Sequence, residues 1–339
     1  MTEKNCYKNF EHPFAQYVRI LGKGQKGSRS LTLDEAFDAF TLILNGEVLD
    51  VQLGAFLMLL RVKEESAEEL TGFVKATKHM LATRIDTLTP TTCDFDWSSY
   101  AGKKKQLPWF LFSIFLLVEN GYSVLLHGES GHTFNRLYTQ DLFKALNLPI
   151  AYSWEEVPKH LASTHFCYFP LEHLCPPLSH IIQLRNILGL RSPVHTLARL
   201  INPLNAQYSM QGIFHPNYRP VHQEACRQLG FKRIAVIKGE GGECERNPAA
   251  DTLVQQVING VFKDETWPRM LAERAMAAEQ LSISDFTAVW QGKQENHYAE
   301  LATVGTLSIA LKLIYPTWHQ EQATQTASNW WEKRNKSFL

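Results

Sequence analysis

The sequence predicts an α/β protein in which a small all-helical N-terminal domain is joined to a larger α/β domain with a mainly parallel central sheet. Two observations carry this prediction. The N-terminal part of the 339 residues shows helix start signals followed by apolar residues at helical spacing. Beyond about residue 110, short apolar strands alternate with helices, a pattern typical of the βαβ units that build parallel sheets.

The helical part contains two capping boxes, in which a Ser or Thr precedes a Glu by three residues. Thr32–Glu35 and Ser66–Glu69 have this pattern, and another helix is predicted from about Asp50. Apolar residues recur on one face of each predicted helix, as expected for helices that pack together. We expect a helical domain over 1–85, with the proline-punctuated helical segment 170–200 packed onto it.

The remaining ranges, 86–169 and 201–339, are predicted to form the α/β domain. Phe110–Glu119 has the pattern of a helix that leads into a short buried strand over Tyr122–Leu126. A second short strand is predicted over Ile234–Ile237, and a glycine-rich segment follows it. Because ligands of α/β proteins bind outside the carboxyl ends of the strands, this following segment is a candidate site.

The composition shows no global charge bias. Hydrophobic residues make up 45% and charged residues 20% of the chain, and 34 basic residues balance 34 acidic ones. Any nucleic-acid or phosphate site must therefore be a local basic patch. The six cysteines form no C-x-x-C pair, and the longest apolar run, 111–118, is far shorter than the roughly 20 residues that span a bilayer. We expect a cytoplasmic protein without membrane contact.

Three successive lysines in the segment Tyr100–Trp109, YAGKKKQLPW, which Phe110 follows, are the strongest local charge signal. Gly102 precedes Lys103, Lys104 and Lys105, and a Pro-Trp pair follows soon after them, which predicts a constrained loop and not a helix face. Lysines on such a turn can each neutralise a backbone phosphate, and the alternative is a solvated run of charge. The aromatic residues of this segment either stack on unpaired bases or pack in the core.

The segment Gly22–Arg29 is a second basic loop, with Lys23, Lys26 and Arg29 among three glycines. It is interpreted either as a mobile arm that closes over a polyanion or as a flexible solvated loop, because glycines allow close approach to a backbone. The loop presents no Asn or Gln at the fixed geometry that base reading requires. Binding without sequence preference is therefore expected.

The glycine-rich segment after the second predicted strand mixes both charges. Glu243 and Glu245 are weak candidates for a Mg²⁺ site, and the alternative is a solvated acidic turn. Lys238 and Arg246 flank these carboxylates and could offset their charge near a polyanion.

The motifs together resemble the anthranilate phosphoribosyltransferase family (glycosyltransferase family 3) across nearly the whole chain. The resemblance lies in Gly46 with Asp50–Leu57, Arg61–Ser66 and Glu69, in Arg185–Arg191 with Asn202-Pro203, in His127-Gly128, and in Gly239–Glu245. It implies the nucleoside phosphorylase/phosphoribosyltransferase-like fold and a homodimer through the helical domain. Arg191 matches a family position that contacts substrate carboxylate or phosphate, and Arg199 fills a position that is small in the family.

The departures from the family fall on the chemistry. The family's GTGGDG loop falls on 100–105, where Gly102 alone of four glycines remains and the aspartate is a lysine. The Lys and Asn of its KHGN motif fall on Leu126 and Glu129, and the Asp of its metal pair falls on Cys244. Mg²⁺ needs carboxylates held near octahedral geometry, so this set is a poor diphosphate site. We interpret these departures as loss of the transferase reaction, and we assign no catalytic residue.

The YbiB-like branch of this family is similar in these same departures, and that resemblance implies nucleic-acid binding. We therefore predict sequence-nonspecific binding of DNA or RNA by a homodimer that needs no cofactor. The alternative is an active phosphoribosyltransferase with an altered substrate, which would use Mg²⁺ at Glu243 and Glu245. The candidate contacts to nucleic acid or phosphate are Lys23, Lys26, Arg29, Gly102, Lys103, Lys104, Lys105, Arg191, Arg199, Lys238 and Arg246.

Overall fold

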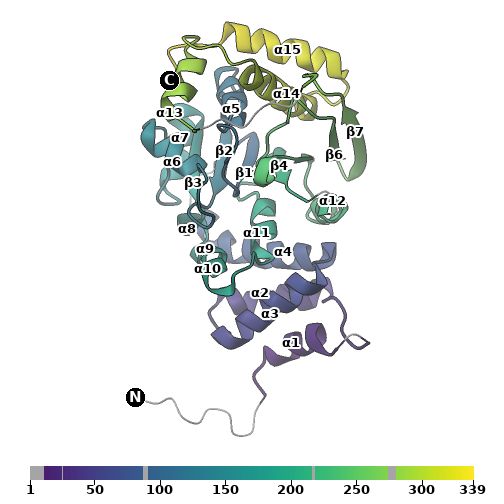
Figure 1. Ribbon diagram of the computed structural model, residues 1–339. Helices are drawn as coiled ribbons and strands as arrows, with labels where there is room; N and C mark the ends of the chain where they lie inside the picture. The colour runs from purple at the N-terminus through teal and green to yellow at the C-terminus, as the bar shows by residue number, and fades with distance from the viewer. Residues whose placement is uncertain (1–10, 25, 87–90, 216–217, 274–279) are drawn as a thin grey trace.

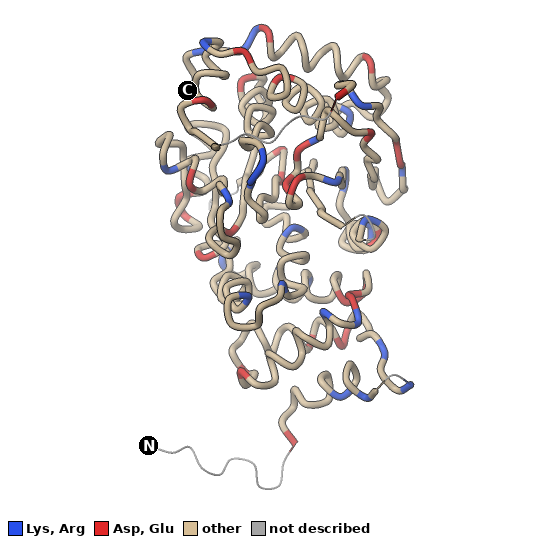
Figure 2. Tube along the Cα trace, viewed as in Figure 1, with Lys and Arg blue, Asp and Glu red and all other residues tan. Residues whose placement is uncertain are grey.

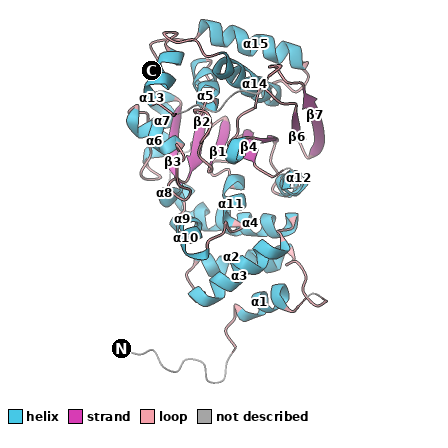
Figure 3. Ribbon diagram, in the orientation of Figure 1, coloured by secondary structure: helices cyan, strands magenta, loops and turns pink. Residues whose placement is uncertain are grey.

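The computed structural model describes residues 11–24, 26–86, 91–215, 218–273 and 280–339. It has two parts: a layer of helices that contains the N-terminal elements, and a larger part built around a sheet (Figure 1). Figure 3 shows that the strands all lie in the larger part, with helices on both sides of them. The predicted fold class is confirmed.

Four helices form the N-terminal layer: α1 (Ala15–Gly22), α2 (Leu33–Leu44), α3 (Asp50–Lys63) and α4 (Ala67–Ile85). Both predicted capping boxes are present, since the Thr32 hydroxyl accepts from the Glu35 N–H and the Ser66 hydroxyl accepts from the Glu69 N–H. In each case the glutamate returns a hydrogen bond to the N-cap backbone, which satisfies N–H groups that the helix itself leaves free.

A seven-stranded sheet forms the centre of the larger part, in the order β3-β2-β1-β4-β5-β6-β7. The first five strands in that order are parallel, and β6 and β7 continue the sheet in antiparallel pairs. The strands are β1 (Phe95–Ser99), β2 (Val124–Gly128), β3 (Phe166–Pro170), β4 (Tyr208–Ile213), β5 (Arg233–Lys238), β6 (Thr252–Ile258) and β7 (Val261–Trp267).

The helices cover both faces of this sheet, so its central strands are apolar on both sides. In β2, Val124 and Leu126 pack in one buried cluster and Leu125 in the other. This alternation explains why the strand appears in the sequence as a short continuous apolar run, as parallel strands do. The remaining helices are α5 (Phe110–Glu119), α6 (Thr139–Ala145), α7 (Glu156–Thr164), α8 (Leu171–Leu174), α9 (Pro176–Gln183), α10 (Arg185–Leu188), α11 (Val194–Leu197), α12 (Arg219–Gln228), α13 (Ile283–Trp290), α14 (His297–Ile314) and α15 (Gln320–Lys333), with 3₁₀ turns η1 (Ala198–Leu200) and η3 (Glu240–Gly242).

Polar contacts join the helical layer to the sheet part. The Thr71 hydroxyl of α4 lies 2.9 Å from the Gln228 side-chain oxygen of α12, and α8 to α11 lie near α4 on the same side of the sheet (Figure 1). Strand β2 begins and ends two residues later than the predicted range Tyr122–Leu126, and its pairing with β1 continues to Gly128. None of the helices in the described ranges combines the length and apolarity that a membrane span requires.

Candidate functional site

The carboxyl ends of four neighbouring parallel strands bring together the loops that carry most of the predicted site residues. The loop after β1 carries the lysine triplet, and the loop after β2 runs over 129–138. The loop after β4 begins at Phe214, and the loop after β5 carries the acidic segment with η3. Because β2, β1, β4 and β5 are consecutive in the sheet, these four loops form one edge, here called the carboxyl edge.

Three glutamates of the loop after β5 accept hydrogen bonds from the backbone of the lysine loop. Glu243 Oε1 accepts from the N–H groups of Ala101 at 2.6 Å and Gly102 at 2.7 Å. Glu240 Oε1 accepts from Lys104 N at 2.9 Å and Lys105 N at 2.7 Å, and Glu245 Oε2 accepts from Phe110 N at 2.9 Å. Backbone N–H groups of this kind are what a phosphate cradle would offer to a ligand. In this chain the carboxylates of Glu240, Glu243 and Glu245 already accept hydrogen bonds from these N–H groups.

Lys103 is buried, at 1% exposure, and its ammonium is paired with the same glutamates. Nζ lies 2.6 Å from Glu245 Oε1 and 3.2 Å from Glu240 Oε2. Burial lowers the pKa of Lys103, but the two carboxylates raise it more, so the net shift is upward and the side chain stays charged. The prediction that Lys103 meets a phosphate is therefore corrected, because the ammonium points inward. Gly102 is also buried, with its N–H already bonded to Glu243.

The acidic segment does not fit Mg²⁺. Lys103 places an ammonium between Glu240 and Glu245, in the position where a cation would have to bind them. Glu243 has one oxygen on two backbone N–H groups and the other buried without a hydrogen-bond partner in the described part of the chain. Within the same residues no group of three or more His, Cys, Asp or Glu side chains is placed to hold a metal. Octahedral coordination by Glu243 and Glu245 would require this packing to be rebuilt.

Glu240, Glu243 and Glu245 together are called the acidic plug. Four arginines gather beside it and are called the arginine cluster: Arg136, Arg185, Arg191 and Arg199. Arg136 Nη1 donates to the carbonyls of Ala101 at 2.9 Å and Gly102 at 3.1 Å. Arg185 donates to the His132 carbonyl at 2.6 Å and also to the Thr133 hydroxyl, and Arg199 donates to the His195 carbonyl.

The backbone of η3 lies against two of these guanidinium groups. A Cβ at Gly241 would lie 2.2 Å from Arg136 Nη1, and one at Gly242 would lie 3.2 Å from Arg199 Nη2. Both glycines also have positive φ, at 67° and 104°, which other residues rarely adopt. The two glycines therefore let both arginines approach the same turn.

The cluster is short of negative charge. None of its members forms an ion pair with a carboxylate within 4.0 Å in the described residues, and Arg199 Nε is buried without a hydrogen-bond partner there. Burial lowers the pKa of Arg199, and the nearby charge of Glu243 offsets this only in part. Burial and then the charges of Arg199, Arg185 and Arg136 lower the pKa of Arg191 to about 10. Four guanidinium groups that repel one another will gain free energy from an added anion. The cluster is therefore suited to bind an anionic group.

The other predicted cations divide into two groups. Lys104, Lys105 and Lys238 are exposed on the carboxyl edge, and Arg191 beside them is half-buried. Arg246 is buried instead, where it lies over the Trp267 ring at 5.1 Å and donates to the Pro268 carbonyl at 2.5 Å. It holds the packing under α14 and does not face the edge, so that prediction is corrected.

The basic loop after α1 lies elsewhere in the molecule. Lys23, Lys26 and Arg29 are exposed, but the loop is on the helical layer, away from the carboxyl edge (Figure 1). Arg29 is held by Glu35 in two hydrogen bonds of 2.6 and 2.7 Å. The structure does not bring these three residues together with the lysine loop. Figure 2 shows Lys and Arg interspersed with Asp and Glu along the described part of the trace.

The aromatic residues of the lysine segment pack in the core. Tyr100, Trp109 and Phe110 are all buried, so none of them is placed to stack on a base. Sequence reasoning missed Arg136 and Glu240, which complete the arginine cluster and the acidic plug. The signal available for Arg136 was its position in the loop that follows a predicted strand.

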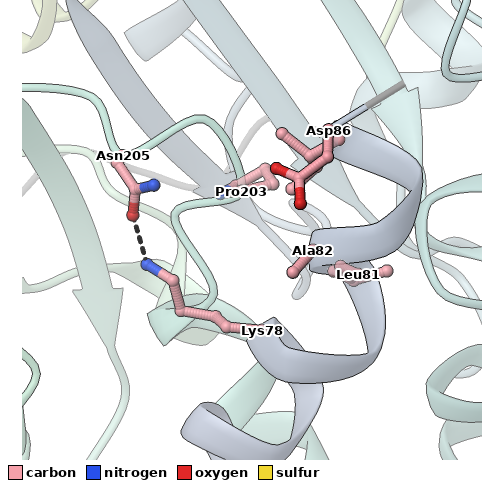
Figure 4. A pocket seen from close by; sticks show the side chains of 7 residues that line it. Lys78, Leu81, Ala82, Asp86, Pro203 and Asn205 are labelled. Carbon is pink, nitrogen blue, oxygen red and sulfur yellow. Dashed lines mark hydrogen bonds between the residues drawn. The ribbon is translucent and has the colours of Figure 1, made fainter. Parts of the chain in front are cut away.

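A separate hollow of about 220 Å³ lies between α4 and the turn at Pro203 and Asn205 (Figure 4). Lys78 points toward it and donates to Asn205 Oδ1 at 2.5 Å. Burial lowers the pKa of Lys78. None of the predicted site residues lines this hollow, so it is not part of the carboxyl edge.

Comparison with known proteins places this geometry in a family. The helical bundle domain of a glycosyl transferase family matches residues 15–80, and the a/b domain of the same family matches residues 115–327. The chain belongs to this anthranilate phosphoribosyltransferase-like family, glycosyltransferase family 3.

Individual relatives include both enzymes and a protein without an assigned role. The chain is 28% identical to the uncharacterized protein YbiB of Escherichia coli K12 over 240 residues, which cover 69% of this chain and 73% of YbiB. It is 29% identical to the anthranilate phosphoribosyltransferase of Symbiobacterium thermophilum over 239 residues, 68% of this chain and 67% of the enzyme. Against the enzyme of Saccharolobus islandicus strain L.S.2.15, the match is 27% over 231 residues, 67% of this chain and 64% of the enzyme.

Solved structures confirm the fold. The anthranilate phosphoribosyltransferase of Saccharomyces cerevisiae in complex with PRPP and Mg superposes with a TM-score of 0.75 at 15% identity, over 95% of this chain and 94% of the enzyme chain. The Thermus thermophilus enzyme gives a TM-score of 0.73 at 17% identity, over 94% of each chain.

The buried His132 predicts a pH dependence of stability. Burial, together with Arg191, Arg185 and Arg199, lowers the pKa of His132 to about 4. The unfolded chain takes up this proton near pH 6.5 and the folded chain does not, so stability is lost as pH falls from about 6.5 toward 4, by up to about 3 kcal/mol. We expect His132→Gln to flatten the fall in urea midpoint between pH 7 and 5.

Glu65 acts in the opposite direction, because burial raises the pKa of its carboxyl to about 7. Because protonated Glu65 favours the folded chain, it adds stability as pH falls from 7 toward 4.5. The contribution of His132 must therefore be taken from the difference between the pH curves of wild type and variant, and not from the wild-type curve alone. Equal pH dependence in the two proteins would show that His132 is not held neutral.

Proposed function

We propose that this protein binds nucleic acid without sequence preference at the carboxyl edge and does not transfer phosphoribosyl groups. The proposal rests mainly on the acidic plug: Glu240, Glu243 and Glu245 accept hydrogen bonds from the backbone N–H groups of the lysine loop. A small diphosphate with Mg²⁺ would have to displace three carboxylates and a buried ammonium to bind there. Outside the plug, Lys104, Lys105 and Lys238 face solvent.

The exposed cations have the arrangement that a phosphate backbone needs. Lys104 and Lys105 extend from a loop whose backbone is fixed by Glu240, and Lys238 is the last residue of β5, two strands away from β1 in the sheet. The arginine cluster adds unpaired positive charge beside them. Contacts of this kind fix a strand through its phosphates and carry no base preference, so they support binding to DNA and RNA alike.

The other candidate function is a Mg²⁺-dependent phosphoribosyltransferase with an altered substrate. The family match and the unpaired arginine cluster favour it, because the cluster could hold an anionic substrate. The two functions predict different ligands for the same edge.

One experiment separates them. Fluorescence anisotropy with labelled 20-mer oligonucleotides should show binding that weakens steeply between about 50 and 200 mM salt. Calorimetry with phosphoribosyl diphosphate and Mg²⁺ should show no heat of binding. Mg²⁺-dependent binding of the diphosphate without oligonucleotide binding would refute the proposal and favour the transferase.

We also propose a homodimer through the helical layer. Helix α3 carries an apolar stripe of Val51, Ala55, Met58 and Val62, spaced at four, three and four residues; Met58 is partly buried and the other three are exposed, Val62 at 84%. An apolar stripe of this kind on a soluble protein indicates an association surface. A dimer would carry two carboxyl edges, and a nucleic acid that reaches both would bind with higher apparent affinity.

Val62→Asp is expected to convert the dimer to a monomer, because a carboxylate in an apolar contact loses its hydration. Sedimentation velocity at micromolar concentration measures the change. Val261→Asp is the matched control, since Val261 is also exposed but lies on β7. A wild-type protein that sediments as a monomer would contradict the dimer.

A further inference from the structure

Two phenylalanines on the carboxyl edge are exposed where large apolar side chains are uncommon. Phe134 is 86% exposed and Phe214 is 50% exposed. Phe134 belongs to the loop after β2, and Phe214 directly follows β4. In the sheet β2 and β4 are the two neighbours of β1, whose loop carries Lys104 and Lys105. The two phenyl groups therefore belong to the loops on either side of the lysine loop.

The backbone that carries each ring is fixed. Leu137 and Lys103 exchange two backbone hydrogen bonds of 2.8 Å, and Arg136 bonds the carbonyls of Ala101 and Gly102, so the Phe134 loop is tied to the lysine loop. Gly239 N donates to the Ile213 carbonyl at 3.0 Å, which holds the residue before Phe214. Hydrogen bonds within the site therefore hold the backbone segments from which these exposed rings extend.

The rings are also open to a partner. Phe214 makes one ring contact among the described residues, with His215 at 4.8 Å and 84°, and Phe134 makes none there. Because neighbouring strands lie about 4.8 Å apart, β2 and β4, whose following loops carry the two rings, are about 10 Å apart. Positive charge lies between and beside them, at Lys104, Lys105 and the arginine cluster.

We propose that the occupant of this edge is a single strand, whose phosphates contact the lysines and arginines while unpaired bases stack on Phe134 and Phe214. This inference rests on the proposed nucleic-acid binding and specifies its substrate class. Every base has an aromatic face, so stacking adds affinity without sequence preference. A duplex keeps its bases stacked on one another and offers these rings only sugar and phosphate, so it gains nothing from them.

The test compares three labelled ligands of equal length at one salt concentration: a dT 20-mer, an abasic strand and a duplex. Wild type is expected to bind the dT strand at least 10-fold more tightly than the abasic strand, since each base–aromatic stack contributes about 5- to 100-fold. Phe134→Leu/Phe214→Leu keeps the apolar bulk and should bring dT affinity down to the abasic value. Its affinity for the duplex should not change.

Phe262→Leu is the matched control, because Phe262 is about half exposed but lies on β7. Phe214→Trp supplies a second readout: the added emission, taken as the difference from wild type with its eight tryptophans, should be quenched by the dT strand and not by the abasic strand. If wild type binds dT, abasic strand and duplex equally, stacking is refuted while nucleic-acid binding stands. If none of the three ligands binds, the proposed function itself is refuted.

Discussion

Replacing Lys103 with methionine is expected to lower the free energy of unfolding by about 3–5 kcal/mol, because it leaves the buried Glu245 carboxylate without its cation. Removing one partner of a buried pair costs more than the pair itself contributes, since the remaining charge stays desolvated. Urea denaturation followed by circular dichroism measures the loss. This substitution tests the assignment of Lys103 as a structural residue.

The same lysine triplet supplies the control. Lys104→Met and Lys105→Met remove exposed side chains and should each change stability by less than about 0.5 kcal/mol. The double variant Lys103→Met/Glu245→Gln should recover part of the lost stability, because the fully buried carboxylate is then absent and the amide oxygen can still accept from Phe110 N, while Glu240 stays without its cation. A Lys103→Met protein as stable as wild type would show that the buried ion pair does not form.

Replacing Lys104, Lys105 and Lys238 together with glutamine is expected to weaken binding of a single-stranded oligonucleotide about 10- to 100-fold near 100 mM salt. Each phosphate contact releases condensed counterions, so losing three contacts should reduce the slope of log affinity against log salt by about 2. Anisotropy titrations at four salt concentrations measure both quantities.

A triple variant of equal charge provides the comparison. Lys75, Lys159 and Lys293 are exposed on α4, α7 and the turn after α13, away from the loops of the carboxyl edge. Their replacement by glutamine lowers the net charge by the same amount and should leave the salt slope nearly unchanged. Equal losses in the two triple variants would mean that general charge, and not the carboxyl edge, drives binding.

The physical link between these two predictions is the direction in which adjacent side chains point. Lys103 lies just beyond the end of β1 and pairs backbone to backbone with Leu137, and its side chain is buried in the protein. Lys104 and Lys105 follow on the turn and extend into solvent. One sequence motif thus contains a structural cation and two exposed ones.

The acidic plug also explains how the family's frame can lose its reaction and stay folded. A glycine-rich loop leaves its N–H groups free for a ligand, and a protein without the ligand leaves them to water. Here Glu243 and Glu240 take those N–H groups, so the loop is held without any ligand. The plug therefore stabilises the lysine loop and closes the diphosphate cradle at once.

Local patterns of residues were enough to define the helices and the class of fold. The capping boxes at Thr32 and Ser66 marked the starts of α2 and α4, and the apolar run gave the bounds of α5 at Phe110–Glu119. These signals are local, because a cap bonds an N–H three residues away and a helix repeats within one turn. The loss of glycines from the 100–105 loop was likewise visible without coordinates.

Which of the candidate cations face solvent, and what holds the others, became known only from the folded chain. Lys103 and Glu245 are 142 residues apart in sequence and meet because β1 and β5 are separated in the sheet by β4 alone. Strand order and side-chain direction also place Arg136 in the site and Arg246 outside it. Hydrogen bonds and ion pairs across a sheet edge depend on strand order and side-chain direction, and neither is encoded in a local pattern of residues.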